Sequence, residues 1–238
     1  MRILVTRPAA DAAPLVAELA ARGHEAVVEP LLIIRPCDDV TIDLGGVQAL
    51  LFTSANGVRA FAGLSARRDL PAFAVGDRTA ASCRAAGFAQ VESAGGDVDD
   101  LARLVAARVA PGGGELLHAA ASAVAGDLGG MLEAAGFKIR RQILYRSEPA
   151  ASLSPEAISA FVGGRIDAVL FFSPRTAQTF VSLARDADLV RFMPGVAACC
   201  LSMAVAEAAG SLAWRRIVIA PAPTSEALLA ATELLPSG

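Results

Sequence analysis

The chain has 238 residues, of which 54% are hydrophobic, so it can bury a substantial core in one large or two small domains. This composition excludes a disordered chain and a disulfide-stapled miniprotein. The mean hydropathy of +0.50 comes mainly from alanine. The longest stretch without a charge or a strong polar break, residues 192–206, is shorter than the roughly 18 apolar residues that a membrane-spanning helix needs. We therefore expect a soluble globular protein that does not bind a membrane.

The charges point to no macromolecular partner. Lysine and arginine total 21 and aspartate and glutamate 24, with no basic face of the kind that binds nucleic acid. Lys138 is the only lysine, so a side-chain cation that meets an anionic ligand is expected to be arginine. The four cysteines have no C-x-x-C spacing, and residues 1–8 lack the apolar region of a signal peptide. Both features predict reduced thiols and a cytoplasmic location.

Short apolar runs alternate with amphipathic helical stretches along the chain. The pattern predicts a strand over residues 3–6, a helix over 9–22 that ends at Gly23, and a strand over 26–29. Further strands are predicted at 49–53, 72–75 and 115–118 and from residues 168, 196 and 216, with helices ending near 66, 87 and 136. Strands separated by helices of this length indicate an α/β fold with mostly parallel sheets.

Two internal repeats suggest a duplicated plan. Residues 49–61 align without a gap with residues 168–180, and the matching pairs are Phe52 with Phe171, Ser54 with Ser173, and Phe61 with Phe180. Residues 3–23 parallel residues 116–136 more weakly. We therefore predict two similar flavodoxin-like α/β lobes with parallel sheets.

The order of the segments predicts how the chain divides. An apolar run over residues 31–35 ends at Pro36, and a similar run over 139–146 precedes a breaker at 147–149. Two extended crossings between lobes, near 31–36 and 142–149, would explain both runs. Lobe one would then be discontinuous, made of residues 1–35 and 148–238, and lobe two would comprise residues 36–147. A cleft beside this two-strand linker is the expected place for a ligand.

Familiar catalytic motifs are missing from the sequence. It has no dinucleotide-binding or phosphate-binding glycine loop, no nucleophile elbow and no cluster with metal-ligand spacing, so no cofactor and no metal are expected. Of the two histidines, His24 follows a helix-ending glycine and is expected at the surface. His118 ends a predicted strand and could either face the cleft or pack in the core.

Small polar residues stand instead where predicted strands end and helices begin, which is the edge at which open α/β sheets bind ligands. Each could simply cap its helix, or its helix start could bind a carboxylate or phosphate. Five such helix starts facing one cleft favour a ligand with several anionic groups. The candidate binding residues are Thr6, Arg7, Ser54, Ala55, Asn56, Arg78, Thr79, Ser173, Pro174, Arg175 and Ser202. Tyr145, the only tyrosine, falls in the return crossing and could serve either function or packing.

A series of short motifs runs along the chain: residues 5–8 (VTRP), 52–58 (FTSANGV), 74–80 (AVGDRTA), 144–145 (LY), 172–174 (FSP), and 220–221 (AP) before 226–229 (EALL). In their order and spacing, these motifs make the sequence resemble the uroporphyrinogen-III synthase family along essentially its whole length. The resemblance implies a cofactor-independent enzyme, a cyclising hydro-lyase of haem biosynthesis. Its implied substrate is hydroxymethylbilane, a linear tetrapyrrole with eight carboxylates, which closes through a spiro intermediate with inversion of ring D and loss of water. It also implies two α/β lobes joined by a two-strand linker.

The resemblance assigns roles to particular residues. Tyr145 corresponds to the family's candidate proton donor to the departing hydroxyl, and Thr79 to a substrate contact. Where relatives have a glycine and a threonine after a strand of the C-terminal lobe, this chain has Ser202 and Val205. The implied protein is a monomer that binds a small molecule and makes a transient contact with hydroxymethylbilane synthase. A two-lobed binding or sensor protein without catalysis, including a paralogue that no longer cyclises the tetrapyrrole, is the alternative.

Overall fold

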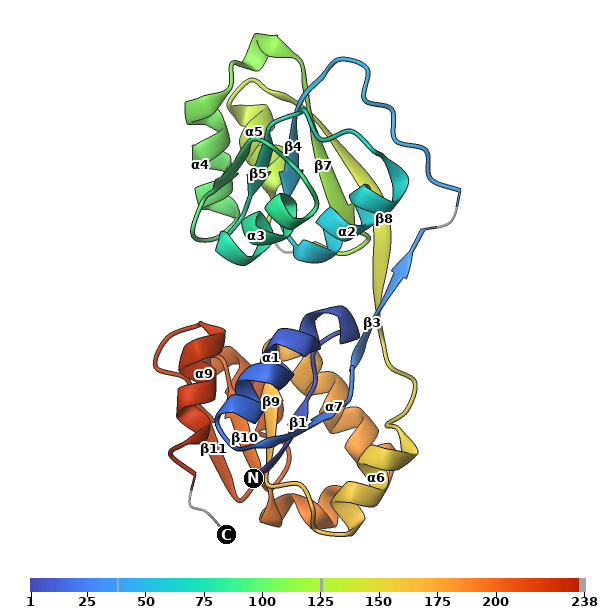
Figure 1. Ribbon diagram of the computed structural model, residues 1–238, viewed down its shortest axis with the longest axis vertical. Coiled ribbons are helices and arrows are strands. Elements are labelled where there is room, and N and C mark those ends of the chain that lie inside the picture. Colours follow the sequence, from blue (N-terminus) through green and yellow to red (C-terminus); the bar gives the residue numbers. More distant parts are fainter. Residues whose placement is uncertain (38, 125, 236–238) are drawn as a thin grey trace. The chain divides into compact units, whose positions relative to one another are not determined.

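Parallel strands joined by helices form two separate sheets in the computed structural model, which describes residues 1–37, 39–124 and 126–235 (Figure 1). The chain divides into two compact units. Unit 1 consists of Met1–Ile33 and Glu148–Gly238, and unit 2 of Ile34–Ser147.

The sheet of unit 1 has the strand order β11-β10-β9-β1-β2, with all paired neighbours parallel. Numbered within the unit, this is the 2-1-3-4-5 order of flavodoxin-like folds. Its elements are β1 (Arg2–Val5), α1 (Ala9–Ala21), β2 (Glu25–Val28), α6 (Pro155–Val162), β9 (Ala168–Phe171), α7 (Pro174–Asp186), a 3₁₀ helix (Val190–Gly195), β10 (Ala197–Cys200), α8 (Met203–Ala209), β11 (Arg216–Ile219) and α9 (Ser225–Thr232).

The sheet of unit 2 has the order β3-β8-β7-β4-β5-β6, and the strands from β8 to β6 are parallel. Its elements are β3 (Leu32–Pro36), β4 (Val47–Phe52), α2 (Ala55–Leu64), β5 (Ala72–Ala74), α3 (Asp77–Ala85), β6 (Val91–Ser93), α4 (Val98–Arg108), a 3₁₀ turn (Pro111–Gly113), β7 (Glu115–Ala121), α5 (Leu128–Ala134) and β8 (Lys138–Pro149). The predicted α/β class with two parallel sheets is confirmed.

The two sheets share one spatial plan, although the chain enters each at a different strand. The order β11-β10-β9-β1-β2 corresponds to β6-β5-β4-β7-β8, so unit 2 is a circular permutation of unit 1. The registers agree, because Ile3 pairs with Ala168 in unit 1 and Leu116 pairs with Ala49 in unit 2. In this correspondence β4 matches β9 and β7 matches β1, and these are the segments that the two sequence repeats align.

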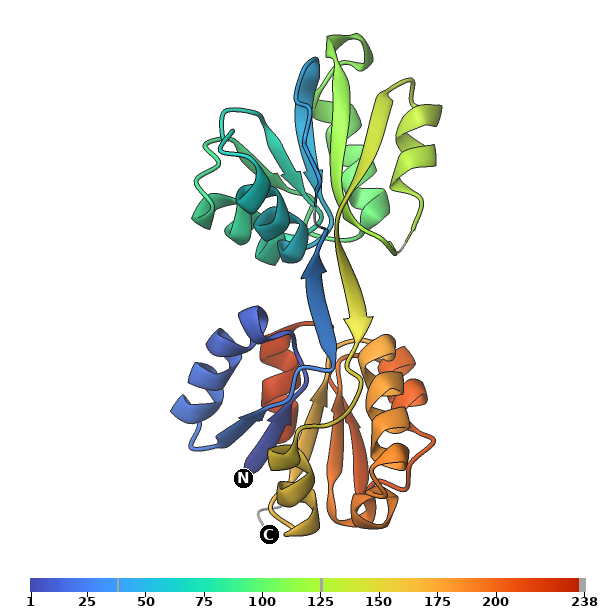
Figure 2. The same cartoon turned by 90° about the vertical axis from the view of Figure 1, so that its right-hand side faces the viewer.

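Helices cover both faces of each sheet, because the strand side chains that point to either face are apolar. In unit 1, α6, α7 and α8 pack with one set of strand residues around Phe171 and Phe180, while α1 and α9 pack on the opposite face around Leu15 and Leu228. In Figure 2 the blue and red helices α1 and α9 lie on the opposite side of this sheet from the orange α7 and α8. In unit 2, α2 and α3 cover one face, and α4 and α5 cover the other.

The chain passes between the units inside two neighbouring strands, β3 and β8. The backbone N–H of Cys37 donates to the carbonyl of Leu144, and that of Ala150 donates to Leu31, so the two strands run in opposite directions. Both passages are therefore hydrogen-bonded strands, in which backbone donors and acceptors are satisfied.

A buried carboxylate ties the end of β2 to the start of α6 within unit 1. Glu29 is only 4% exposed. Its Oε1 accepts the backbone N–H of Ser154 at 2.9 Å, and its Oε2 accepts the Ser154 hydroxyl at 2.5 Å. The same Ser154 hydroxyl accepts the N–H of Ala157 and caps α6. A charged acceptor thus fixes two segments that lie 125 residues apart.

Replacing Glu29 by alanine should lower the free energy of unfolding by about 1–3 kcal/mol, because it leaves buried donors without an acceptor. Urea denaturation of Glu29→Ala and wild type measures this difference. The exposed Glu207 of α8 provides the matched control, and Glu207→Ala should change stability by less than about 0.5 kcal/mol. Equal losses in both variants would contradict the proposed tie.

Candidate functional site

In unit 1, three candidate residues follow three neighbouring strands. Thr6 follows β1, Ser173 follows β9, and Ser202 is two residues beyond the end of β10. Since these strands are parallel and adjacent, their carboxyl ends lie at one edge of the sheet. The strand order reverses between β1 and β9, and such a reversal is where open α/β sheets bind their ligands.

The hydroxyls at this edge have different tasks. Thr6 is fully buried, and its Oγ1 donates to the carbonyl of Leu170 at 2.6 Å, which fastens β1 to β9. Ser173 caps α7 by accepting the N–H of Thr176 at 3.2 Å. Within the described part of the chain, the Ser202 side chain makes no capping bond to α8. Thr6 and Ser173 therefore have structural roles, and the Thr6 hydroxyl faces away from solvent.

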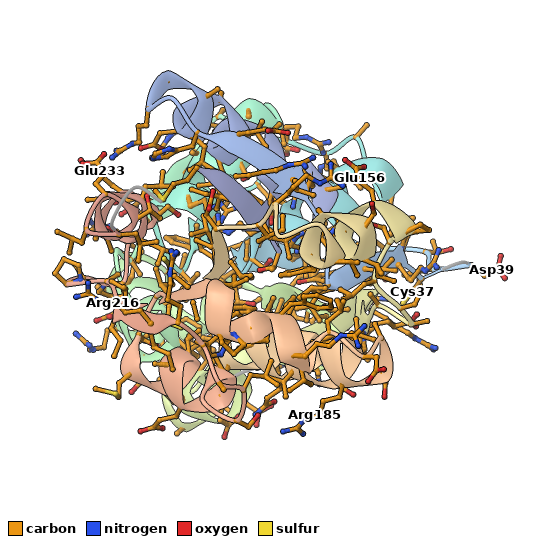
Figure 3. All side chains as sticks on the ribbon, turned by 90° about the horizontal axis from the view of Figure 1, so that it is seen from below. Cys37, Asp39, Glu156, Arg185, Arg216 and Glu233 are labelled. Carbon is orange, nitrogen blue, oxygen red and sulfur yellow. The ribbon has the colours of Figure 1, made fainter. Side chains whose placement is uncertain are left out.

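Two arginines stand at the same edge of unit 1. Arg7 follows Thr6, and its guanidinium carbon lies 3.9 Å from the centre of the Phe172 ring. Arg175 lies in the first turn of α7 and is exposed. Other arginines lie elsewhere in the unit: Arg185 near the end of α7 and Arg216 at the start of β11 project outward from the ribbon (Figure 3).

In unit 2, the candidate residues follow β4 and β5, which are neighbours in the sheet. Ser54 caps α2 by accepting the N–H of Asn56 at 3.1 Å, and Ala55 is buried beneath it. Arg78 and Thr79 lie in the first turn of α3, whose N-cap is Gly76 and which has no side-chain cap among the described residues. The start of α3 is therefore a helix N-terminus without a side-chain cap, a kind of position at which proteins commonly bind anionic groups.

The registers of the two sheets relate α3 to α8. Ala72 and Ala198 occupy equivalent positions, because Ala72 pairs with Leu50 and Ala198 pairs with Val169. Counting onward, Ser202 matches Gly76 and Val205 matches Thr79. Thr79 and Val205 are both buried. The chain thus has a hydroxyl at this helical position in unit 2 and a methyl group in unit 1.

A β-bulge determines where Tyr145 points. In the pairing of β7 with β8, Ala120 is opposite Ile143 and Ala121 is opposite Tyr145, so Leu144 is an extra residue. Strict alternation would place Tyr145 on the same face as Ile143. The bulge turns it to the face of α2 and α3, where Leu144 and Tyr145 both belong to the apolar cluster that contains Phe52. Tyr145 is 5% exposed. Bulges commonly aim a side chain in this way next to active sites.

His118 lies at the equivalent strand reversal of unit 2, between β4 and β7. Its Nε2 is hydrogen-bonded to the Thr53 hydroxyl at 3.1 Å. Both residues line a pocket of about 180 Å³, together with Arg141 and two residues of the opposite charge, Asp127 and Glu133. Burial, and then the positive charge of Arg141, lower the pKa of His118 to about 4. The imidazole is therefore neutral near pH 7 and cannot act there as an acid.

The other candidate chemistries find little support. No group of three or more His, Cys, Asp or Glu residues in the described ranges could hold a metal ion. Burial raises the pKa of the thiols of Cys83, Cys199 and Cys200 to about 12, so these cysteines are poor nucleophiles. Within residues 1–37, 39–124 and 126–235, no helix is long and apolar enough to span a membrane.

Phe172 is the residue that the sequence analysis missed. It belongs to a motif that the analysis noticed, but its contact with Arg7 joins positions far apart in the chain. The sequence signal that could have found it is an aromatic residue directly after one strand and an arginine after another. That signal becomes meaningful only once β1 and β9 are known to be neighbours.

The fold and these strand ends define a class: two-unit α/β proteins with hydroxyls, arginines and helix starts at the carboxyl ends of their parallel strands. A family model described as uroporphyrinogen-III synthase HemD matches residues 13–230, so the chain belongs to the uroporphyrinogen-III synthase family, whose members are enzymes of haem biosynthesis.

Solved structures agree on the fold. The uroporphyrinogen-III synthetase of Helicobacter pylori 26695 is 18% identical with a TM-score of 0.66, over 99% of this chain and 100% of that one. A mutant uroporphyrinogen III synthase of the extremely thermophilic bacterium Thermus thermophilus is 18% identical with a TM-score of 0.53, over 98% and 96%. Curated protein sequences give no significant match.

The low pKa of His118 predicts a loss of stability in acid. Unfolded histidine binds a proton below about pH 6.5, whereas folded His118 stays neutral down to about pH 4. The contribution of His118 to the free energy of unfolding is therefore complete above pH 6.5 and is lost as the pH falls toward 4. Between pH 7 and pH 5, wild type should lose about 2 kcal/mol more unfolding free energy than His118→Gln. Urea denaturation at the two pH values measures these losses, and equal losses in wild type and His118→Gln would refute the prediction.

Proposed function

We propose that this chain converts hydroxymethylbilane into uroporphyrinogen III, closing the linear tetrapyrrole into a macrocycle with inversion of ring D and loss of water. The match of the family model over residues 13–230 carries this proposal. The fold agrees with it, because both units present helix starts and arginines at sheet edges, which suit a substrate with eight carboxylates.

The chemistry of the reaction lies largely in the substrate itself. When the hydroxymethyl oxygen leaves as water, the terminal pyrrole becomes an electrophilic azafulvene that another pyrrole carbon attacks. Closure without inversion occurs spontaneously, so the enzyme must hold the substrate in the conformation that leads to the spiro intermediate. Such catalysis rests on positioning and on stabilising the positive charge of the azafulvene.

In this proposal, each unit by itself offers residues that can bind carboxylates of the substrate. Arginines make bidentate contacts, and hydroxyls and backbone N–H groups of helix starts supply the others. The Thr6 hydroxyl contributes by holding β1 to β9. The proposed contacts are Arg7, Ser173, Pro174, Arg175 and Ser202 in unit 1, supported by the buried Thr6, and Ser54, Ala55, Asn56, Arg78 and Thr79 in unit 2.

Tyr145 is the proposed proton donor to the departing hydroxyl. A phenol remains protonated near pH 7 and can donate a proton where a carboxylate cannot. The bulge at Leu144 supports this role, because it aims Tyr145 to the side of the sheet from which α2 and α3 start. Nearly complete burial also limits access of water, which favours a directed proton transfer over exchange with solvent.

The substrate's instability suggests how the enzyme works in the cell. Because hydroxymethylbilane closes spontaneously to the wrong isomer, rapid capture from hydroxymethylbilane synthase through a transient contact would raise the yield of isomer III. We place the protein in the cytoplasm as a monomer, in keeping with the small soluble substrate.

The direct test supplies hydroxymethylbilane, generated in situ by its synthase, to the purified protein and resolves the uroporphyrin isomers after oxidation. We expect predominantly isomer III, whereas the reaction without the protein gives isomer I. A folded protein that yields isomer I alone would overturn the proposal. Retained tetrapyrrole binding in that case would indicate a binding protein without catalysis.

Removing the Tyr145 hydroxyl should slow the chemical step. We expect Tyr145→Phe to lower kcat about 100-fold, the smaller end of the range for general acid catalysis, with little change in KM. Thr79→Val is the matched comparison, because it removes a hydroxyl proposed to bind, and it should raise KM with kcat nearly unchanged. Thermal unfolding of both variants checks the fold. An unchanged kcat in Tyr145→Phe would exclude the proton-donor role.

A further inference from the structure

Arg7 and Phe172 form a close pair at the strand reversal of unit 1. The guanidinium carbon of Arg7 lies over the Phe172 ring at 3.9 Å from its centre. Arg7 follows β1, and Phe172 directly follows β9. The hydrogen bond from the Thr6 hydroxyl to Leu170 joins the same two strand ends, one residue before Arg7 and two before Phe172. The pair is thus built on a rigid seam at the edge where the substrate is proposed to bind.

The fold itself does not require this pair. In unit 2 the equivalent positions are Ala120, which matches Arg7, and Thr53, which matches Phe172, as counted from the registers of the two sheets. Unit 2 forms the same strand reversal with no arginine or aromatic residue at these positions. The Arg7–Phe172 pair is therefore an addition to the shared architecture.

The stacking geometry suits a particular ligand. An aromatic face attracts a guanidinium through the ring quadrupole. The N–H donors of a guanidinium lie in its own plane, in a fork that matches the geometry of a carboxylate. A planar carboxylate that approaches along the edge can then accept two parallel N–H bonds, which fixes both its distance and its orientation.

We propose that Phe172 is a positioning residue that holds the Arg7 guanidinium for a bidentate bond to one carboxylate of the tetrapyrrole. This rests on the proposed function, and it deepens it by assigning one substrate carboxylate to the β1/β9 edge. Phe172 acts through Arg7, so its loss weakens substrate binding and leaves the chemical step intact.

Unit 1 offers a matched control of the same chemistry. The guanidinium carbon of Arg191 lies 5.0 Å from the ring centre of Phe192, which is partly buried as Phe172 is. Both residues belong to the 3₁₀ helix Val190–Gly195 that leads into β10. They therefore lie toward the amino end of that strand, at the sheet edge opposite to Arg7. Phe192→Leu removes a stacked ring without touching the proposed site.

The experiment compares Phe172→Leu, Phe172→Tyr, Arg7→Met and the double variant with Phe192→Leu and wild type. Steady-state kinetics with hydroxymethylbilane give kcat and KM, and quenching of uroporphyrin III fluorescence gives a Kd that does not depend on turnover. Phe172→Leu should raise KM and Kd about tenfold with kcat within twofold. Phe172→Tyr keeps the ring and should restore both constants, while Phe192→Leu should match wild type.

The double variant tests whether Phe172 acts through Arg7. Adding Phe172→Leu to Arg7→Met should raise KM and Kd by less than a further twofold, because the interaction between the two side chains is already lost. The proposal would be overturned if the increases in KM and Kd of the two single variants multiply in the double variant, or if Phe172→Leu leaves both constants unchanged. Either result counts even if wild type makes isomer III. If wild type binds uroporphyrin III but makes no isomer III, the proposed function fails and the Kd series still decides the role of Phe172. Absence of both binding and turnover overturns both.

Discussion

The pairing of β1 with β9 is the constraint on which unit 1 depends. It joins the first strand of the chain to a segment that follows the whole of unit 2, with Ile3 opposite Ala168. Side chains reinforce the seam at both ends: Asp167 accepts the backbone N–H of Arg2 at 2.6 Å, and Thr6 donates to Leu170. Closing so long a loop has an entropic cost, which these buried bonds and the apolar cores on both faces offset.

The pairing of β1 with β9 is also where the strand order of unit 1 reverses. A strand reversal separates the helices that follow the two central strands, and so leaves their starts and the residues before them accessible to a ligand. The equivalent reversal in unit 2 carries a different pair, the Thr53 hydroxyl and the neutral imidazole of His118. One plan thus provides a stacked cation in one unit and an uncharged polar pair in the other.

Several elements could be predicted from local patterns, and others were missed although their signals were present. The helices α4 and α6 were not predicted, yet Asp97 and Asp100 form a capping box at α4 and Ser154 caps α6 before Pro155. The strand β6, whose three residues are all only partly buried and show no apolar run, was not predicted either. The strand predicted over 115–118 extends to Ala121 in the structure. Residues 119–121 are alanines, which are not typical strand formers, so the sequence pattern did not predict them although they are buried.

The sequence by itself determined the α/β class, the duplication and the family, because periodicity, repeats and motif order are properties of neighbouring residues. It also placed small polar residues and arginines after strands. Only the tertiary structure decided which strand ends are neighbours, since that depends on pairing between distant segments. It brought Phe172 under Arg7, engaged the Thr6 hydroxyl with Leu170, and turned Tyr145 to the other face of the sheet through one extra residue in β8. The alternation of faces can be predicted from the sequence of one strand alone, whereas a bulge is defined only by the pairing with the neighbouring strand.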